Sequence, residues 1–250
     1  MKIKFLALTA AMMISTTSFA QFSQSKNFSN SNNEISKGWN SLYVQYNSIG
    51  TSYSLSSFND KYEDYGDEYQ KAIDNSGMSD KLNAFTIGYN RAINLTPSTP
   101  LYLEVGAALQ YAFYSDEEKE VTLKCTANML TAKVPVSLLY HVAIPNSDFA
   151  IEPFVGIDFK YNIIGTAKRE VTYKYNNKTY KDKDKIDNIF DKKKCDGHPA
   201  NRFQAGWHVG ANFVYKKAFI GISYGQDFSK FHDDIDLKFN TLSATLGCRF

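Results

Sequence analysis

Apolar and polar residues alternate with a period of two in eight segments of this 250-residue chain. The clearest segment is 101–113, where every odd position holds an apolar or aromatic residue and polar residues such as Glu104 and Gln110 lie between them. Alternation of this kind predicts β-strands with one apolar face. The eight predicted strands span residues 39–48, 83–93, 101–113, 130–142, 149–162, 203–213, 220–225 and 241–250. The predicted fold class is therefore all-β.

The two faces of these strands favour a membrane barrel over a water-soluble one with an apolar interior. The polar face consists of Gly, Ala, Ser, Thr and Asn with isolated charges, whereas the exterior of a soluble barrel carries many Lys and Glu. The apolar face has aromatic residues near the strand ends, as in a membrane-interface girdle. These residues are Tyr111, Phe113, Tyr140, Phe149, Tyr161 and Phe213. The pattern predicts an eight-stranded antiparallel transmembrane β-barrel.

The connections between the strands alternate in length. Short turns occupy 94–100, 143–148 and 215–217, and longer segments occupy 50–81, 114–120, 165–202 and 227–238. Barrels of the bacterial outer membrane have short periplasmic turns and longer outer loops. We therefore expect this location, with both termini in the periplasm and the four longer segments outside the cell.

The N-terminus has the features of a secretory signal peptide. Two lysines precede an apolar or small run at 5–14, and Ser18 and Ala20 supply the small residues of a cleavage site. The apolar run is too short to span a bilayer, which takes about 20 residues. We expect a signal peptide at 1–20, a flexible periplasmic leader at 21–38, and the barrel at 39–250.

Composition narrows the classes of partner and cofactor. The mean hydropathy of −0.38 argues against a helical membrane protein, and a net charge of +2 argues against nucleic-acid binding. The chain has three cysteines and lacks the Cys and His spacing of a zinc site. We expect no cofactor and no metal, and as partners the outer-membrane lipid, lipopolysaccharide and an unidentified external ligand.

Strand parity places seven ionisable residues in the barrel lumen. Charges of both signs inside a narrow barrel can pair with one another, and an eight-stranded barrel is just wide enough to be filled by side chains. The predicted lumen residues are Glu104, Lys133, Glu152, Asp158, Lys160, His208 and Arg249. We expect a filled lumen, with a proton path, a small-ligand site or a narrow transporter as alternatives.

The outer segments divide by charge. Segment 165–202 has a net charge of +5, whereas 50–81, 114–120 and 227–238 have −4, −3 and −2. These segments could neutralise one another over the barrel mouth. Alternatively, Lys192, Lys193 and Lys194 could bind lipopolysaccharide phosphates or an acidic glycan. We expect a structural or surface-binding role through these charged segments.

Catalysis is the main alternative to that role, because some small barrels modify lipid A. Such an enzyme needs a His with a nearby Ser and a carboxylate at the outer rim or the lipid face. His232, beside Asp233 and Asp234, is the one rim candidate, and a solvated acidic loop is the favoured explanation for it. We expect no catalytic residues and no enzyme activity.

The positions of the cysteines allow one intramolecular disulfide. Cys125 and Cys195 are both expected outside the membrane, whereas Cys248 belongs to the periplasmic end of the last strand. Because bonded cysteines have Cα atoms within about 7 Å, only a Cys125–Cys195 bridge is feasible. Three unpaired thiols are the alternative.

Three segments carry recognisable motifs: Lys133 through Pro135 to Tyr140, 153–156 and 206–211. The first is similar to a Pro-containing strand, and the other two resemble further strands, of the PorT-like outer-membrane β-barrel domain family and the small eight-stranded barrels of the OmpX type. The C-terminal Phe250 resembles the aromatic signal that the barrel-insertion machinery reads. The resemblance implies the fold and location, and suggests an accessory role in a secretion system as another alternative.

Overall fold

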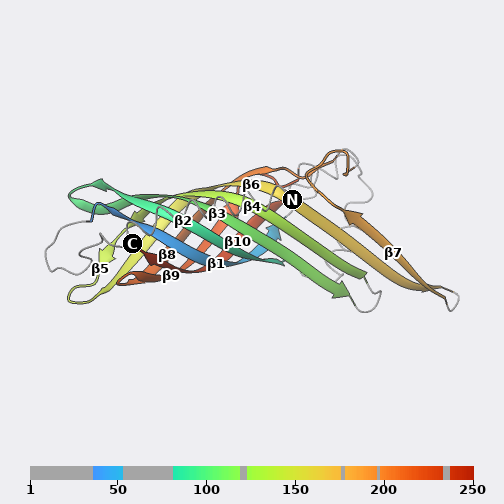
Figure 1. Ribbon diagram of the computed structural model, residues 1–250, viewed down its shortest axis with the longest axis horizontal. Coiled ribbons are helices and arrows are strands. Elements are labelled where there is room, and N and C mark those ends of the chain that lie inside the picture. The colour runs from blue at the N-terminus through green and yellow to red at the C-terminus, as the bar shows by residue number, and fades with distance from the viewer. Residues whose placement is uncertain (1–35, 53–80, 119–122, 176–177, 196–197, 233–236) are drawn as a thin grey trace.

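The computed structural model describes residues 36–52, 81–118, 123–175, 178–195, 198–232 and 237–250 (Figure 1). The predicted signal peptide, most of the predicted leader, and nearly all of segment 50–81 lie outside these residues. Within the described part of the chain, no helix is long and apolar enough to cross a membrane.

Eight antiparallel strands close into a barrel, as the alternation pattern predicts (Figure 1). The wall follows chain order, and it closes where β10 pairs with β1 and where β4 pairs with β6. Closure satisfies the backbone hydrogen bonds of every strand in the wall, which a lipid environment requires. The wall strands are β1 (Gly38–Ser52), β2 (Lys81–Thr96), β3 (Thr99–Glu118), β4 (Leu123–Tyr140), β6 (Phe149–Tyr175), β8 (Phe203–Tyr215), β9 (Ala218–Asp227) and β10 (Lys238–Arg249).

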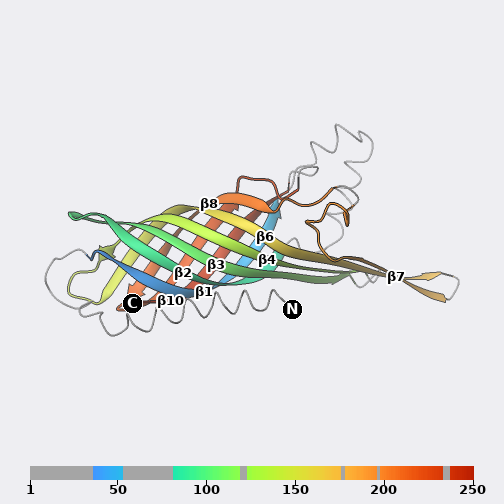
Figure 2. The same cartoon turned by 45° about the horizontal axis from the view of Figure 1, so that its top comes forward.

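The two ends of the barrel differ in construction. At the end that we call terminal, β1 begins, β10 ends, and tight turns at 97–98, 144–148 and 216–217 join neighbouring strands. Asn146 and Lys216 have φ angles of 58° and 53° in these turns. The two-residue strand β5 (Val142–Ala143) also lies here and pairs with the start of β6. The opposite end, which we call distal, holds the longer connections (Figure 2).

Beyond the barrel at the distal end, β6 continues outward and pairs with β7 (Lys178–Ile186) (Figure 2). The sequence analysis placed this strand within loop 165–202, which was wrong. The reason is that 181–185 alternates Lys with Asp instead of alternating apolar with polar residues. A strand that has water on both faces carries no apolar period for pattern analysis to detect.

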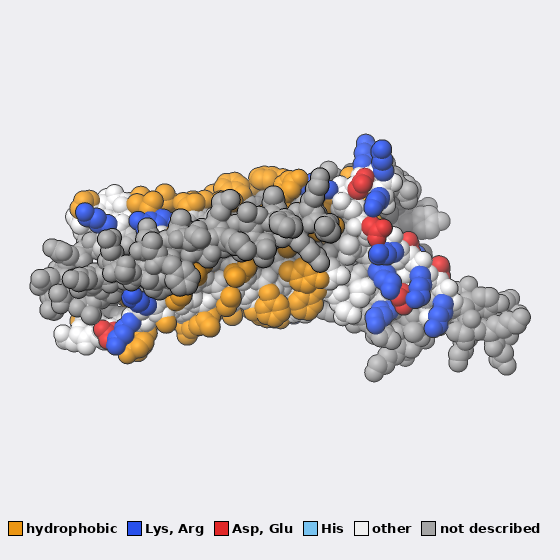
Figure 3. All heavy atoms as spheres, in the orientation of Figure 1, with side chains coloured by type: hydrophobic (Ala, Val, Ile, Leu, Met, Phe, Trp, Pro, Cys, Tyr) orange, Lys and Arg blue, Asp and Glu red, His pale blue; other side chains and the backbone are white. Residues whose placement is uncertain are grey.

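The outer wall of the barrel is apolar, and the side chains that face inward are small or polar. In β2, Phe85 and Ile87 are 60% and 62% exposed, whereas the alternate residues Ala84 and Thr86 are buried. Figure 3 shows hydrophobic side chains along the visible wall, with charged side chains gathered beyond it. This inverted distribution is that of a barrel surrounded by lipid.

Aromatic rings on the wall lie near both ends of the barrel, where the sequence predicts a girdle. Phe159 and Phe203 stack with ring centroids 6.4 Å apart in the distal half. Phe149 and Tyr215 contact each other at 4.7 Å beside the terminal turns. All four rings are exposed on the outer wall. Rings at these two levels suit the two interfaces of a bilayer.

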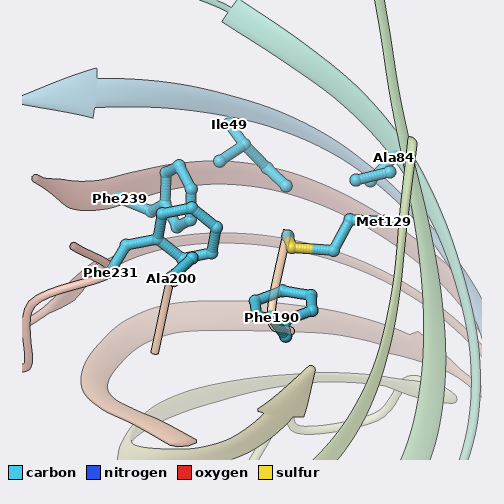
Figure 4. Packing of buried hydrophobic residues seen from close by; sticks show 8 residues of the cluster. Ile49, Ala84, Met129, Phe190, Ala200, Phe231 and Phe239 are labelled. Carbon is cyan, nitrogen blue, oxygen red and sulfur yellow. The ribbon is translucent and has the colours of Figure 1, made fainter. Parts of the chain in front are cut away.

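A hydrophobic cluster lies at the distal mouth of the barrel (Figure 4). Phe190 and Ala200, from the connection that follows β7, pack there against Met129 of β4. Phe231 packs edge-on against Phe190, with ring centroids 5.9 Å apart. The complete cluster is Ile49, Ala84, Ala112, Met129, Phe190, Ala200, Phe231 and Phe239. The 187–202 connection therefore folds back over the barrel mouth.

If the outer wall lies in a bilayer, the loss of unfolding free energy caused by a charged substitution should depend on how deep the residue lies. We expect Ile87→Arg, in the middle of β2, to lower the free energy of unfolding by about 2–4 kcal/mol, because the guanidinium would lie at the bilayer midplane. Ile93→Arg, close to the terminal turn, should cost about 0–1 kcal/mol because the side chain can reach the headgroups. Urea unfolding in lipid vesicles measures both values, and equal costs would contradict this placement.

Candidate functional site

The predicted lumen residues all lie inside the barrel. Glu152 is fully buried and Arg249 is 3% exposed. The other predicted residues line an internal cavity of about 90 Å³ to which Arg249 also contributes. They are Glu104, Lys133, Asp158, Lys160 and His208. Strand parity thus identified which residues point inward, but not how they pair.

The strongest contact in the lumen joins Glu152 of β6 to Arg249 of β10. Nη1 of Arg249 donates to Oε1 of Glu152 at 2.6 Å, and Nη2 donates to Oε2. Nδ1 of His141 lies 2.5 Å from the same Oε1. A bidentate pair of this kind fixes geometry as well as supplying energy. The pair therefore links the last strand of the barrel to the strand on the far side of β8 and β9.

Aromatic rings enclose Arg249 at the terminal end. The guanidinium carbon lies 4.3 Å from the ring centroid of Trp39 and 5.4 Å from that of Phe219. Trp39 in turn packs against Tyr102 with ring centroids 4.4 Å apart, and Leu139 belongs to the same buried cluster. Cation–π contacts strengthen when they are shielded from water. These residues occupy the lumen at the terminal end.

A second network in the middle of the lumen centres on His208. Oγ of Ser137 lies 2.8 Å from Nε2 of His208, and Oδ2 of Asp158 lies 3.2 Å from Nδ1. Lys133 reaches the same carboxylate at 4.0 Å. Gly156 lies between Ser137 and His208 in the sheet, and a Cβ there would be about 2.5 Å from Nε2. The glycine therefore lets these two side chains meet.

The order Ser137, His208, Asp158 is that of a hydrolase triad, and the sequence analysis did not find it. The three residues come from three different strands, so only strand register brings them together. All three lie between the distal cluster and the terminal aromatic residues, within the lumen. A substrate would have to pass one of these closures. We interpret the group as a structural network in which Ser137 is hydrogen-bonded to His208, whereas Asp158 lies beside Nδ1 without a hydrogen bond to it.

Two further contacts involve the predicted lumen residues Lys160 and Glu104. Nζ of Lys160 lies 2.5 Å from Oδ1 of Asp227, a buried residue at the distal end of β9. Nδ2 of Asn90 donates to Glu104 at 2.9 Å. Asp227 and Asn90 were not among the predicted lumen residues, because one ends a strand and the other is uncharged. Pairing of these groups offsets part of the cost of burying them.

The predicted anion-binding lysines lie on a turn at the distal end. Lys192, Lys193 and Lys194 are exposed, and no ion pair links them to another described residue. Oδ1 of Asp191 accepts a hydrogen bond from the backbone N–H of Lys193 at 3.0 Å. The neighbouring Phe190 is buried in the distal cluster. The turn is thus anchored on the barrel mouth with its ammonium groups in solvent.

The remaining predicted residues lie apart from these groups. Nε2 of His232 contacts the carbonyl oxygen of His198 at 3.3 Å, and the neighbouring carboxylates at 233 and 234 are outside the described residues. Phe250 is buried, and its backbone exchanges two hydrogen bonds with Asn40 at 2.9 and 3.0 Å. The C-terminal aromatic therefore belongs to the closed wall.

The predicted Cys125–Cys195 disulfide is not formed in the structure, where both residues are thiols. Sγ of Cys195 donates to the carbonyl of Asn188 at 3.7 Å, near the barrel mouth. Cys125 lies four residues beyond Met129 of the distal cluster, which is about 13 Å along β4. The sequence analysis could not foresee that the 187–202 connection folds back to the mouth.

Comparisons with known proteins agree with this architecture. Residues 6–250 match the family described as outer membrane protein beta-barrel domain. No curated protein matches the chain.

Solved structures of outer-membrane proteins match the chain at low sequence identity and with TM-scores below 0.5. Ail, the attachment invasion locus protein of Yersinia pestis, is 14% identical with a TM-score of 0.43, over 86% of this chain and all of that chain. Neisserial surface protein A is 11% identical with a TM-score of 0.34, over 84% and 97%. The outer membrane enzyme PagL is 8% identical with a TM-score of 0.40, over 82% and 98%.

The buried pair predicts an asymmetric response to substitution. Arg249→Met should lower the free energy of unfolding by about 3–5 kcal/mol, because it leaves Glu152 charged and buried. The double variant Glu152→Leu with Arg249→Met should recover most of that loss, because neither charge remains. Lys183→Gln, which breaks an exposed pair with Glu170, is the control and should cost no more than about 1 kcal/mol. If Arg249→Met and Lys183→Gln lowered the free energy of unfolding equally in chemical unfolding, that result would contradict a decisive role for the Glu152–Arg249 pair.

Proposed function

We propose that this chain, which belongs to the outer membrane protein beta-barrel domain family, is a closed outer-membrane anchor that carries a charged, surface-binding distal end. The barrel fixes the protein in the outer membrane. The distal end faces outward and binds the phosphate groups of lipopolysaccharide close to the membrane surface through Lys192, Lys193 and Lys194. The observation that carries this proposal is the contrast between a filled lumen and an exposed, ionic distal end.

The filling of the lumen supports an anchor over a transporter. The cavity of about 90 Å³ lies between the distal cluster and the aromatic residues around Arg249. Its polar groups are drawn into pairs such as Lys160 with Asp227. A solute that crossed the barrel would have to break these pairs and displace both closures. Pairs buried at this depth are costly to separate.

The unequal ends support the outward orientation of the distal end. Tight turns at 97–98, 144–148 and 216–217 lie at the terminal end, whereas the extended strands and β7 lie at the distal end. In outer-membrane barrels the short turns are periplasmic and the longer connections are outside. Both termini of the barrel, at Gly38 and Phe250, are then periplasmic.

The turn that carries Lys192, Lys193 and Lys194 is suited to binding phosphate groups at the membrane surface. Its base is fixed, because Phe190 is buried and Arg202 donates from Nη1 to the carbonyl oxygens of Asn162 and Ile163. Three adjacent ammonium groups then meet an anionic ligand with little loss of backbone freedom. A pre-ordered site of this kind binds more tightly than a flexible one.

The triple variant Lys192→Gln, Lys193→Gln, Lys194→Gln tests this function. We expect its affinity for purified lipopolysaccharide to fall on the order of tenfold, because three charges near an anionic surface are lost. Lipopolysaccharide that has been enzymatically dephosphorylated should bind the wild type and the variant equally. The matched control is Lys37→Gln, Lys216→Gln, Lys217→Gln at the terminal end, which removes the same charge and should leave binding unchanged.

Two results would overturn the proposal. One is equal binding of phosphorylated lipopolysaccharide by the wild type and the variant with the three distal substitutions. The other concerns orientation: a cysteine introduced at Ser98 should not be labelled by an impermeant reagent on intact cells, whereas one introduced at Lys185 should be. Labelling at position 98 with an intact membrane would invert the topology.

A further inference from the structure

The distal parts of β6 and β7 pair with each other beyond the barrel in a segment that we call the distal ribbon (167–175 and 178–186), and β6 also pairs with β4 as far as Val171. Its register pairs Ala167 with Ile186 and Tyr175 with Lys178. All five residues from 181 to 185 are exposed, so neither face of β7 is covered there. The side chains of 181–185 are therefore available to a partner from solvent.

The charges of the distal ribbon are sorted by face. Successive residues of a strand point to opposite faces, so Lys181, Lys183 and Lys185 share one face of β7. The printed contacts agree: Lys183 reaches Glu170 at 3.4 Å, whereas Asp184 reaches Arg169 at 3.9 Å on the other face. Register also places Lys168 opposite Lys185.

The basic face of the ribbon consists of Lys168, Lys181, Lys183 and Lys185. Glu170 lies among them, and strand register places Lys124 of β4 opposite Glu170 on the same face. Glu170 contacts both Lys168 and Lys183, and the hydrogen bond from Lys168 is the main cause that lowers the pKa of this carboxyl. Lys185 also contacts Asp187 at 2.7 Å. Two carboxylates therefore face four ammonium groups, which leaves positive charge in excess.

The spacing of the basic face suits an elongated ligand. Alternate residues of a strand are about 6.6–6.8 Å apart, so the three lysines of β7 form a straight row. A chain molecule with regularly repeated anionic groups can contact each of them in turn. A compact anion such as phosphate could contact only one or two.

The height of the row argues against lipid phosphate as its ligand. Lys168 lies seven residues beyond Tyr161, a wall aromatic of the distal half, which is about 23 Å along β6. With a strand tilt of about 35–45°, that is roughly 17 Å above the girdle. The headgroup layer of a bilayer is only about 5–8 Å thick. The row is therefore in the space that extended surface polymers occupy.

We propose that the basic face of the distal ribbon binds a linear anionic polysaccharide. The proposal rests on the outward orientation of the distal end, but its ligand and its residues differ from those of the Lys192–Lys194 turn. The polymer lies along β7, and its sulfate or carboxylate groups pair with Lys181, Lys183 and Lys185. The carboxylates of Asp182 and Asp184, on the opposite face, keep a second polymer from binding there.

The test compares two triple variants of the full-length protein in lipid nanodiscs, with dextran sulfate as the probe. Lys181→Gln, Lys183→Gln, Lys185→Gln should weaken binding at least about tenfold at low salt. It should also reduce the slope of log K against log salt by about two, as the loss of three contacts to a linear polyanion requires. The matched control is Lys192→Gln, Lys193→Gln, Lys194→Gln. It removes the same net charge and should change the affinity for dextran sulfate no more than about twofold.

Two further variants separate a binding role from a structural one. Lys181→Arg, Lys183→Arg, Lys185→Arg keeps the charges and should keep the affinity. Asp182→Asn with Asp184→Asn changes only the opposite face and should not weaken binding. Far-ultraviolet circular dichroism of each variant checks that the strands are retained.

Three outcomes would overturn the inference. Dextran sulfate binding could be weakened equally by the Gln substitutions at 181, 183 and 185 and by those at 192, 193 and 194, which is a net-charge effect, or it could be unaffected by the substitutions at 181, 183 and 185. The third outcome is tighter binding of a single-stranded oligonucleotide than of dextran sulfate at equal charge. Lipopolysaccharide binding by the same variants reports separately on the proposed function. If the 192–194 variant alone loses lipopolysaccharide binding and still binds dextran sulfate, the result supports the turn as the lipopolysaccharide site and the ribbon as the polysaccharide site.

Discussion

The buried pair between Glu152 and Arg249 is the interaction on which the interior of this barrel depends. The effective cost of removing one ion from water is several kcal/mol, and a barrel surrounded by lipid offers no water on its outer side. The cost is offset because both terminal nitrogens of the guanidinium meet the carboxylate, His141 contacts the same group, and the ring of Trp39 covers the cation. Removing one partner would leave the other charge isolated, whereas removing both would leave neither charge of the pair to be buried.

The same physical constraint separates the membrane part from the distal part. Within the membrane, side chains must alternate between lipid and a narrow lumen, so Phe85 and Ile87 face outward while Thr86 faces inward. Beyond the membrane both faces of a strand meet water, and the alternation of apolar and polar residues ends. There β7 alternates Lys with Asp, and the faces of the ribbon differ by the sign of charge. The same sheet thus contacts lipid in the barrel wall and exposes charged side chains to water at its distal end.

Strand parity was sufficient to predict the eight crossing strands and the lumen residues, because lipid imposes one rule on every strand. It could not predict that Ser137 meets His208, or that Asp227 meets Lys160, because those contacts depend on register across the barrel. It also missed β7, whose charged alternation resembles a loop, and it suggested a Cys125–Cys195 bridge that the structure does not contain. Sequence pattern predicts a side chain's face well and its partner poorly.

The filled lumen is the central claim of this account, and the conductance of the purified wild-type protein in planar lipid bilayers tests it most directly. Because paired charges and two aromatic closures occupy the lumen, the account predicts no current steps above those of a protein-free bilayer at any applied voltage that the bilayer tolerates. Stable, reproducible current steps from correctly folded protein would contradict it, because ions could then pass where the structure places Glu152, Arg249 and the distal cluster.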